Sequence, residues 1–377
     1  MSQTMQGVAV VPGSREVRLV GQPVPTLQSP TDVKLRILEV GVCGTDREIC
    51  AFDYGTPPPG SDHLVIGHES LGEVEDIGSG VTGIQRGDLV VPMVRRPCPH
   101  EHCRACRAGR QDFCFTGDIR ERGIKEAHGF MTEFVVDDAR YMNMVPKALR
   151  PVAVLVEPLT IAEKALIQLW GLQERLPWDC PHSRGGVRGH CHSAVVLGAG
   201  PVGLLGAMAF SAAGFETFVY SAEPEDHPKS ELIRSFGARF VSARTHTMDQ
   251  LRETVGNIDL AYEAAGNSRV AFDLLRVLGT NGIFVMTGVP GHKGPAPVDT
   301  DGLMRNVVLK NQIVLGTVNA GRDAFEAAIR DLGVFLNRWP GAVRSLITGR
   351  HPVDAHRDLL LGAPSGIKNV IVFAGQA

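Results

Sequence analysis

The sequence contains neither a long apolar run nor an excess of charge of one sign. No segment reaches the roughly 18 uninterrupted apolar residues that a membrane helix needs. The first residues, MSQTMQGVAVVPG, lack the basic stretch and apolar core of a secretion signal, so we expect none. The formal net charge of −3 and the pI near 6.5 give no electrostatic reason to expect nucleic acid or an anionic membrane as a partner.

Internal repeats and low-complexity tracts are also absent, which argues against solenoids and disordered linkers. At 377 residues the chain is long enough for two domains. Its 44% apolar and 21% charged residues are ordinary for a globular protein. The 43 glycines and 24 prolines indicate many turns and short strands rather than a helical bundle.

Four of the eight cysteines lie in one short polar stretch, PCPHEHCRACRAGRQDFC. Thiolates spaced C-x4-C-x2-C-x7-C can surround a tetrahedral structural zinc from a single loop. The alternative is a set of free or disulfide-bonded surface cysteines, but metal-type clustering without an export signal favours zinc in a reducing cytoplasm. We expect the neighbouring His100 and His102 not to bind the metal, because four thiolates suffice. The predicted ligands are Cys98, Cys103, Cys106 and Cys114.

The pattern along the chain predicts two kinds of architecture. Segments such as DVKLRILEVGV, LGEVEDIGSGV and GDLVVPMV indicate a β-rich first part. LTIAEKALIQLW, near residue 160, has helical periodicity. The apolar segments ETFVYSA, ARFVSA, IDLAYEAAG and GIFVMTGV alternate with helical stretches, as in a parallel sheet wound with helices. The predicted fold class is therefore α/β, with a β-rich domain beside a doubly wound parallel sheet.

A glycine-rich turn follows the buried strand AVVL and opens a helix. In Gly198-Ala-Gly200-Pro201-Val202-Gly203, the first glycine turns the chain and the second admits a pyrophosphate. The third lets the helix pack closely on the strand. The helix N-terminus then offers free N–H groups to the phosphates. A tight strand–helix turn without a ligand is the alternative, but the surrounding βα units favour a dinucleotide.

The next strand, TFVYSAEPED, should carry the group that selects the coenzyme. Ala222 occupies the usual position of the ribose-binding acid, and Glu223 follows it. No arginine is nearby in the sequence, and Glu223, Glu225 and Asp226 would repel a phosphate. This favours NAD over NADP, although these carboxylates would equally suit a solvated loop, and both coenzymes stay open.

Three scattered pieces could form a second metal site with an open position. They are Cys43 in GVCGTD, His68-Glu69 in GHES and Glu157 in VEPL. A thiolate, an imidazole and carboxylates suit a zinc that polarises a substrate hydroxyl. Each piece also occurs for structural reasons, so spacing alone leaves this site open.

A second group of cysteines and histidines lies in the connector before the first strand of the parallel sheet. It could suggest a third metal site, but we expect an exposed polar loop instead. Its members are Cys180, His182, His190, Cys191 and His192.

The motifs together resemble the zinc-dependent medium-chain dehydrogenases, and within them the microbial glucose (aldose) 1-dehydrogenases. GVCGTD, GHESLGEVEDIGSGVTGIQRGDLV, the cysteine loop, VEPL and VVLGAGPVG occur in the order of the superfamily. RRPC, GRQDFC, ERGI, AHGFM, EKAL and GTVN are similar to the narrower group. The resemblance covers nearly the whole chain. It implies a GroES-like catalytic domain at residues 1–163 and 321–377 and a Rossmann nucleotide-binding domain at 164–320.

The resemblance also implies residue roles. Catalytic zinc would be held by Cys43, His68 and Glu69, with Glu157 as a fourth ligand acting directly or through water. Thr45 would receive the proton of the substrate hydroxyl; where many alcohol dehydrogenases carry a relay histidine, this chain has Glu48. Sugar hydroxyls would contact Thr45, Glu121, Glu157 and Asn319. The nicotinamide half of the coenzyme would lie along Thr287, Gly288, Val289, Thr317 and Asn319.

The implied activity is transfer of hydride from C1 of an aldose to NAD or NADP, giving the lactone, with two zinc ions per chain. A polyol or secondary-alcohol dehydrogenase is the first alternative. A non-catalytic protein that binds nucleotide and zinc is the second. We expect a small sugar substrate, a homodimer or homotetramer, and a cytoplasmic location, without a nucleic-acid or membrane partner.

Overall fold

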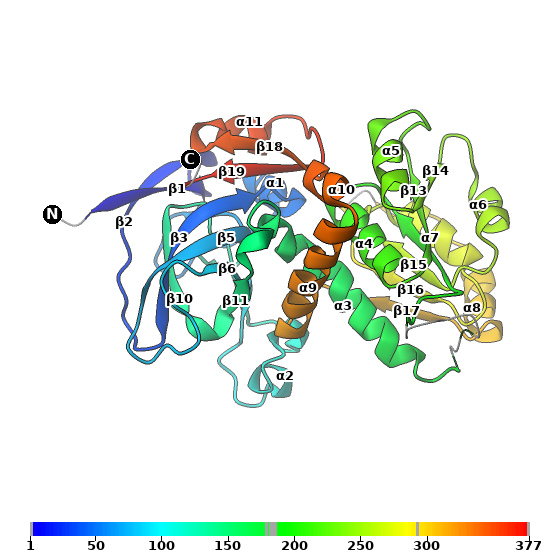
Figure 1. Cartoon of the computed structure of the whole chain (residues 1–377), viewed down its shortest axis with the longest axis horizontal. Coiled ribbons are helices and arrows are strands. Elements are labelled where there is room, and N and C mark those ends of the chain that lie inside the picture. The colour runs from blue at the N-terminus through cyan, green and yellow to red at the C-terminus, as the bar shows by residue number, and fades with distance from the viewer. Residues whose placement is uncertain (1–2, 178–179, 181–186, 292–293, 375–377) are drawn as a thin grey trace. The chain divides into compact units, whose positions relative to one another are not determined.

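The computed structural model describes residues 3–177, 180, 187–291 and 294–374 (Figure 1). The chain divides into two compact units. The first comprises residues 1–157, 319–332 and 346–377, and the second comprises residues 158–318 and 333–345. Residues 158–163 and 333–345, which the sequence prediction assigned to the catalytic domain, thus belong to the second unit. The reason is that the chain passes between the units inside two continuous helices, α3 (Val156–Gln173) and α9 (Arg322–Arg338).

The first unit is β-rich, as predicted. One three-stranded sheet has the order β2-β1-β4, and another has the order β7-β8-β9. The seven-stranded sheet runs β11-β6-β5-β3-β19-β18, with β10 also paired to β3. The strands are β1 (Thr4–Val11), β2 (Glu16–Pro23), β3 (Asp32–Gly41), β4 (Leu64–Val65), β5 (Glu69–Ile77), β6 (Leu89–Pro92), β7 (Arg95–Arg96), β8 (Arg120–Arg122), β9 (Glu126–Ala127), β10 (Phe134–Asp138), β11 (Met142–Val145), β18 (Ile347–Pro352) and β19 (Lys368–Val372).

Strand β3 organises this unit because it pairs with β5, β10 and β19. Its apolar residues Val33, Leu35 and Ile37 are fully buried in a core to which β1, β5 and β10 contribute. Short helices close the connections: α1 (Gly44–Cys50), α2 (Arg104–Arg107) and α11 (His356–Leu361), with 3-10 turns η1 (Gln111–Phe113), η2 (Ala139–Tyr141), η3 (Lys147–Leu149), η4 (Ala153–Leu155) and η5 (Val353–Ala355).

The second unit contains a parallel six-stranded sheet of order β14-β13-β12-β15-β16-β17. This order reverses direction beside β12, as in a doubly wound nucleotide-binding fold, and it confirms the predicted fold class. Its strands are β12 (Ser193–Leu197), β13 (Glu216–Ser221), β14 (Arg239–Ser242), β15 (Leu260–Glu263), β16 (Ile283–Met286) and β17 (Ile313–Gly316). Its helices are α4 (Pro201–Ala212), α5 (Pro228–Ser235), α6 (Met248–Val255), α7 (Ser268–Val277), α8 (Thr300–Leu309) and α10 (Pro340–Ser345).

The strands of this sheet are continuous apolar segments in the sequence, because helices pack against the sheet and bury their side chains. Helix α4 packs against β12 and β13, and α7 packs against β15. Consequently Val195, Val196, Phe218 and Phe284 are fully buried.

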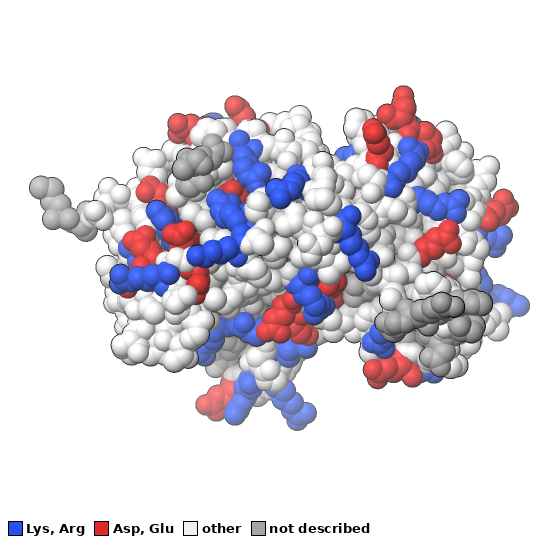
Figure 2. Space-filling view, in the orientation of Figure 1, with Lys and Arg blue, Asp and Glu red and all other residues white. Residues whose placement is uncertain are grey.

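On the face that Figure 2 shows, basic and acidic side chains are interspersed. Within the described residues, no helix combines the length and the apolar character that crossing a membrane requires.

Candidate functional site

Cys43 lies between the end of β3 and the start of α1. Its backbone is extended, with φ −104° and ψ 162°, and its N–H donates to Asp46 Oδ2 at 2.9 Å. Asp46 is fully buried in the first turn of α1. This hydrogen bond holds the loop that presents the Cys43 thiol.

His68 and Glu69 stand at the start of β5, opposite the end of β3. The register pairs Glu69 with Gly41. A side chain at Gly41 would collide with the Glu69 carboxylate, so glycine at this position lets the carboxylate cross β3 toward Cys43. His68 Nδ1 lies 3.3 Å from Asp46 Oδ1, so the buried carboxylate that holds the cysteine loop also lies beside the imidazole.

Cys43, His68 and Glu69 form a cluster that fits a zinc ion. Each offers one ligand atom, and these atoms lie within 4.8 Å of one another. Burial alone would lower the pKa of His68, but Asp46 and Cys43 raise it well above its usual value. A thiolate, an imidazole and a carboxylate are the donor set of a catalytic zinc, with a position left for a substrate oxygen.

Lys368 is a member of this site that the sequence analysis missed. Its Nζ donates to Glu69 Oε1 at 2.8 Å, to Glu69 Oε2 at 2.5 Å and to the Val42 carbonyl at 3.2 Å. Both side chains of the ion pair are only 2% exposed. Burial alone would lower the pKa of Lys368, but Glu69 and Cys43 raise it. Lys368 thus fixes the position of the Glu69 carboxylate beside the other two ligands.

Glu157 and Thr45 are the other predicted members of this site. Glu157 lies in the first turn of α3 and is not part of the three-residue cluster. Burial raises the pKa of Glu157 to about 7, while the charge of His68 opposes this rise and that of Glu69 adds to it. Glu157 therefore interacts electrostatically with two residues of the cluster, His68 and Glu69. Thr45, in the first turn of α1, is part-buried two residues after Cys43.

Glu121 and Asn319, the predicted sugar-binding residues, lie together. The Asn319 amide donates to Glu121 Oε1 at 3.2 Å. Arg95 Nε donates to the same oxygen at 3.0 Å, and both side chains of this ion pair are largely buried. Burial raises the pKa of Tyr54, and the Glu121 charge adds to this rise. Arg95 therefore belongs to this polar group, although sequence reasoning did not select it.

The four-cysteine loop forms the group that its spacing predicted. The sulfur atoms of Cys98, Cys103, Cys106 and Cys114 lie within 4.8 Å of one another, which fits a closed tetrahedral zinc. Burial alone would raise the pKa of Cys114, but hydrogen bonds from Thr116 lower it to about 6, toward the thiolate that zinc requires. The group contains no histidine.

The residues of the second unit that were predicted to hold the coenzyme follow strands of the parallel sheet. Register pairing aligns Leu197 with Glu263, Glu263 with Met286, and Met286 with Gly316. The turns after these strands therefore emerge side by side at the carboxyl edge, where ligands of open α/β sheets bind.

The glycine-rich turn has the conformation that its three glycines predicted. Gly198 has φ +104°, a region that favours glycine. Gly200 precedes helix α4, Pro201 occupies its first turn, and a side chain at Gly200 would meet no described atom within 4 Å. A side chain at Gly203 would collide with the Gly198 carbonyl. Val202, between them, is part-buried in the first turn. The turn leaves room for a pyrophosphate at the helix N-terminus.

The segment after β13, which was predicted to select the coenzyme, contacts two cations. Glu223 accepts hydrogen bonds from Ser221 and, at 2.7 Å, from Lys229 Nζ. Burial alone would raise the pKa of Glu223, but Lys229 and Ser221 lower it. An arginine is also present: Arg244 Nε donates to the Ala222 carbonyl at 2.7 Å. Sequence proximity could not reveal this arginine, because Arg244 comes from the segment after β14, 22 residues along the chain.

Glu263 organises the turns that follow β15 and β16, and sequence reasoning missed it. This buried carboxylate accepts the N–H groups of Ala265 at 2.8 Å, Gly266 at 2.7 Å and Gly288 at 3.0 Å. Thr287 Oγ1 donates to the Glu263 carbonyl at 2.7 Å. A polar residue ending the apolar strand IDLAYE was the available signal.

The remaining predicted coenzyme residues differ in exposure. Val289 is 73% exposed directly after the Thr287–Gly288 turn. Thr317 is largely buried and accepts the Gln168 amide at 2.8 Å, and its N–H donates to the Met286 carbonyl. Asn319 belongs to the first unit.

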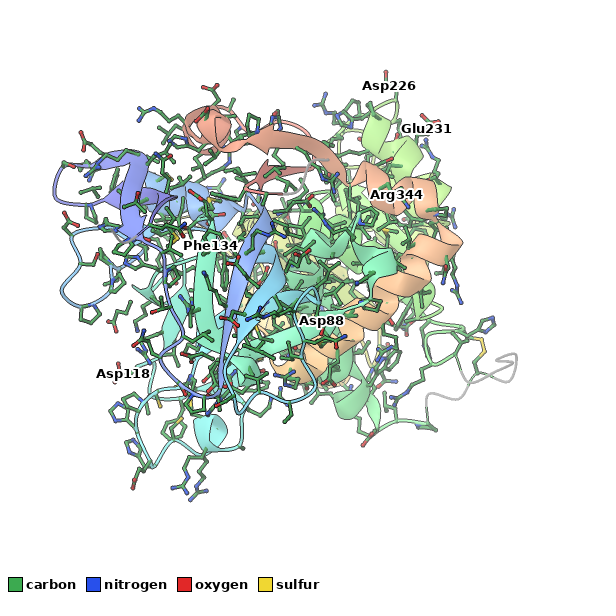
Figure 3. All side chains as sticks on the ribbon, turned by 60° about the vertical axis from the view of Figure 1, so that its left-hand side comes forward. Asp88, Asp118, Phe134, Asp226, Glu231 and Arg344 are labelled. Carbon is green, nitrogen blue, oxygen red and sulfur yellow. A yellow bond between two sulfur atoms is a disulfide. The ribbon has the colours of Figure 1, made fainter. Side chains whose placement is uncertain are left out.

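The connector before β12 contains a disulfide that the sequence analysis did not predict. Cys180 and Cys191 are joined, and Figure 3 shows this disulfide as a yellow bond. His190 Nδ1 lies 3.2 Å from Cys180 Sγ. His192 Nδ1 lies 3.7 Å from Asp259 Oδ1, and His182 falls outside the described residues.

Comparison with known proteins identifies the family. Residues 150–373 match the model of the glucose dehydrogenase C-terminus, and residues 29–147 match that of the alcohol dehydrogenase GroES-like domain. Glucose 1-dehydrogenase of Methanocella arvoryzae is 36% identical over 97% of this chain and 99% of its own. Glucose 1-dehydrogenase 1 of Caldivirga maquilingensis is 36% identical over 97% of this chain and 98% of its own.

A solved structure agrees with these relatives. Glucose dehydrogenase of Haloferax mediterranei, in complex with NADP, Zn and gluconolactone, superposes with a TM-score of 0.86 at 30% identity. The match covers 98% of this chain and 100% of that one. With both family models matched in order and relatives aligned from end to end, the chain belongs to the glucose dehydrogenase family of the zinc-dependent medium-chain dehydrogenases.

Proposed function

We propose that this chain is an aldose 1-dehydrogenase that oxidises C1 of a glucose-type sugar and reduces NADP or NAD. The C1–H bond breaks and its electron pair moves as hydride to the nicotinamide. The C1 hydroxyl loses its proton to solvent, and the C1–O bond becomes the carbonyl of the lactone. The observation that carries this proposal is the Cys43–His68–Glu69 cluster, in which Cys43 is part-buried and the other two residues are buried, in a chain of this family.

Residues of the first unit would bind zinc and accept the proton of the C1 hydroxyl. Cys43, His68 and Glu69, with Glu157 beside them, would hold zinc, which supplies Lewis acidity to the C1 hydroxyl when bound. Thr45 would accept the hydrogen bond of that hydroxyl and pass its proton outward, since Glu48 replaces a relay histidine.

The other sugar hydroxyls would meet a separate polar group. Glu121 would accept hydrogen bonds from them and Asn319 would donate. Arg95 keeps the Glu121 carboxylate in place through its 3.0 Å contact.

The coenzyme would lie across the carboxyl edge of the parallel sheet. Gly198, Gly200, Pro201, Val202 and Gly203 would receive the pyrophosphate. Thr287, Gly288, Val289, Thr317 and Asn319 would follow the nicotinamide half.

Two cations at the ribose end support NADP as a coenzyme. Lys229 and Arg244 lie where a 2′-phosphate would approach Ala222 and Glu223. Glu223 would contact the ribose hydroxyls of NAD. Because this part of the chain offers both cations and a carboxylate, we expect it to bind either coenzyme.

We also propose that the enzyme is a cytoplasmic homo-oligomer. Strand β17 is the last of its sheet, and Met304, Val308 and Leu309 on the adjacent helix α8 are 71%, 63% and 65% exposed. A sheet edge beside large apolar side chains favours pairing with a second copy, since burial removes both from water.

The test is a panel of aldoses and polyols incubated with NAD and with NADP, with reduced coenzyme read by absorbance. Reduction with glucose, galactose or xylose is expected. A polyol such as sorbitol oxidised faster than every aldose would favour the polyol alternative, and no turnover with any substrate would refute the proposal.

Two cysteine variants refine the test. Cys43→Ser should remove activity and one zinc per chain. Cys50→Ser is the matched control, since Cys50 is buried seven residues later and lies outside the cluster. Equal activity of the two variants would exclude the assigned cluster.

A further inference from the structure

The connector between α3 and β12 carries a third set of metal-ligand side chains, apart from the Cys43–His68–Glu69 cluster and the four-cysteine loop. Cys180, His190 and Cys191 each offer one ligand atom, and these atoms lie within 4.8 Å of one another. His190 Nδ1 is 3.2 Å from Cys180 Sγ and 3.5 Å from Cys191 Sγ. His190 and Cys191 are exposed and Cys180 is partly exposed, so ions and reductants in solution can reach the group.

The two cysteines are joined as a disulfide, with their Cα atoms 5.9 Å apart. A thiolate and not a disulfide sulfur is the usual ligand for a soft divalent cation. The same three residues can therefore exist in two chemical states. The oxidised state is a disulfide with a histidine beside it, and the reduced state is a pair of thiols and an imidazole facing one point.

The histidine end of this group is held by the body of the second unit. Gly189 N–H donates to the Ala213 carbonyl at 3.0 Å, and Glu216 N–H donates to the His192 carbonyl at 2.9 Å. Arg188 lies over the ring of Trp170, 4.8 Å from its centre. His190 and Cys191 thus stand on a fixed turn, and the disulfide ties Cys180 to it. These contacts give the ligand atoms a preset arrangement, which lowers the entropy cost of binding an ion.

We propose that Cys180, His190 and Cys191 form a redox-controlled site for a thiophilic divalent cation, for which Zn²⁺ is the probe. In the oxidised chain the two sulfurs are bonded to each other and the site binds no ion. An external dithiol reduces the bond: two electrons and two protons reach the sulfurs, and the dithiol becomes a disulfide. Zn²⁺ then binds two thiolates and the imidazole, releasing the two thiol protons to solvent. Water completes the coordination.

This site is independent of the proposed dehydrogenase reaction, and its test counts thiols and zinc rather than turnover. The chain has eight cysteines, six of which are free in the structure. After incubation with an oxidised dithiol, denaturation with a chelator and alkylation, mass spectrometry should find six labelled cysteines and a peptide linking Cys180 to Cys191. After reduction it should find eight. Eight labelled cysteines before reduction would overturn the proposal.

Zinc is counted by elemental mass spectrometry on the folded holoenzyme, washed free of excess metal in each redox state. The reduced protein should carry one more zinc per chain than the oxidised protein. Cys180→Ser and Cys191→Ser should abolish that difference, and His190→Ala should weaken binding of the additional ion at least tenfold. His246→Ala, a part-exposed histidine of the same unit outside the group, is the matched control and should keep the difference. Equal zinc in both redox states of the natural chain would overturn the proposal.

Discussion

Replacing Lys368 with methionine should destabilise the first unit by about 3–5 kcal/mol, the usual cost of breaking a buried ion pair from one side. Lys368 and Glu69 are both 2% exposed, and three hydrogen bonds of 2.5–3.2 Å leave from Lys368 Nζ. Methionine has a similar length but no charge. The variant therefore leaves the Glu69 carboxylate in a low-dielectric interior without its cation.

The measurement is urea unfolding followed by circular dichroism at neutral pH, on chelator-treated protein, so that no metal ion replaces the missing charge. Arg36→Met is the matched control. Arg36 on β3 pairs with Glu73 on β5 at 2.6 Å in the same sheet, but the two side chains are 47% and 33% exposed. An exposed pair contributes about 0–1 kcal/mol, so this variant should unfold near the midpoint of the natural chain.

A double-mutant cycle isolates the charge effect. Adding Glu69→Gln to Lys368→Met removes the uncompensated carboxylate, and the double variant should recover at least about 2 kcal/mol relative to Lys368→Met. If Lys368→Met costs no more than Arg36→Met, or if the double variant is no more stable than Lys368→Met, the reasoning from burial is refuted.

Three further predictions concern pH, coenzyme and assembly. Burial alone would raise the pKa of Asp137, but Arg122 and Arg96 lower it to about 2. This stabilisation, about 2 kcal/mol, is therefore present above pH about 4 and lost as the pH falls toward 2. Asp137→Asn should accordingly differ most from the natural chain at neutral pH in guanidinium unfolding, and an equal difference at pH 2.5 would contradict the assignment. Arg244→Ala should raise the KM for NADP at least tenfold and that for NAD less than twofold. The exposed Arg234→Ala should change neither, and equal effects of Arg244→Ala on both coenzymes would exclude a 2′-phosphate contact. Met304→Glu should lower the oligomeric mass in analytical ultracentrifugation, because a charge in an apolar interface is costly, and an unchanged mass would place the interface elsewhere.

Local sequence patterns were sufficient to predict the features of this protein that are formed within a single short segment. The apolar strands, the turn from Gly198 to Gly203 and the spacing from Cys98 to Cys114 each depend on neighbours within about twenty residues. Their geometry follows from backbone conformation and short-range ligand spacing. The fold class and the family could therefore be predicted from the sequence, and both are confirmed by the sheet topology and the relatives.

Tertiary structure decided the contacts that join distant segments, because no periodicity connects them. Glu69 and its cation Lys368 are 299 residues apart in sequence. Arg244 reaches the Ala222 carbonyl only because β14 pairs with β13. The chain alone established which chemical groups are present, since these are set by residue type. Strand pairing and burial determined which charged side chains pair with one another, because an ion pair depends on distance through space rather than along the chain.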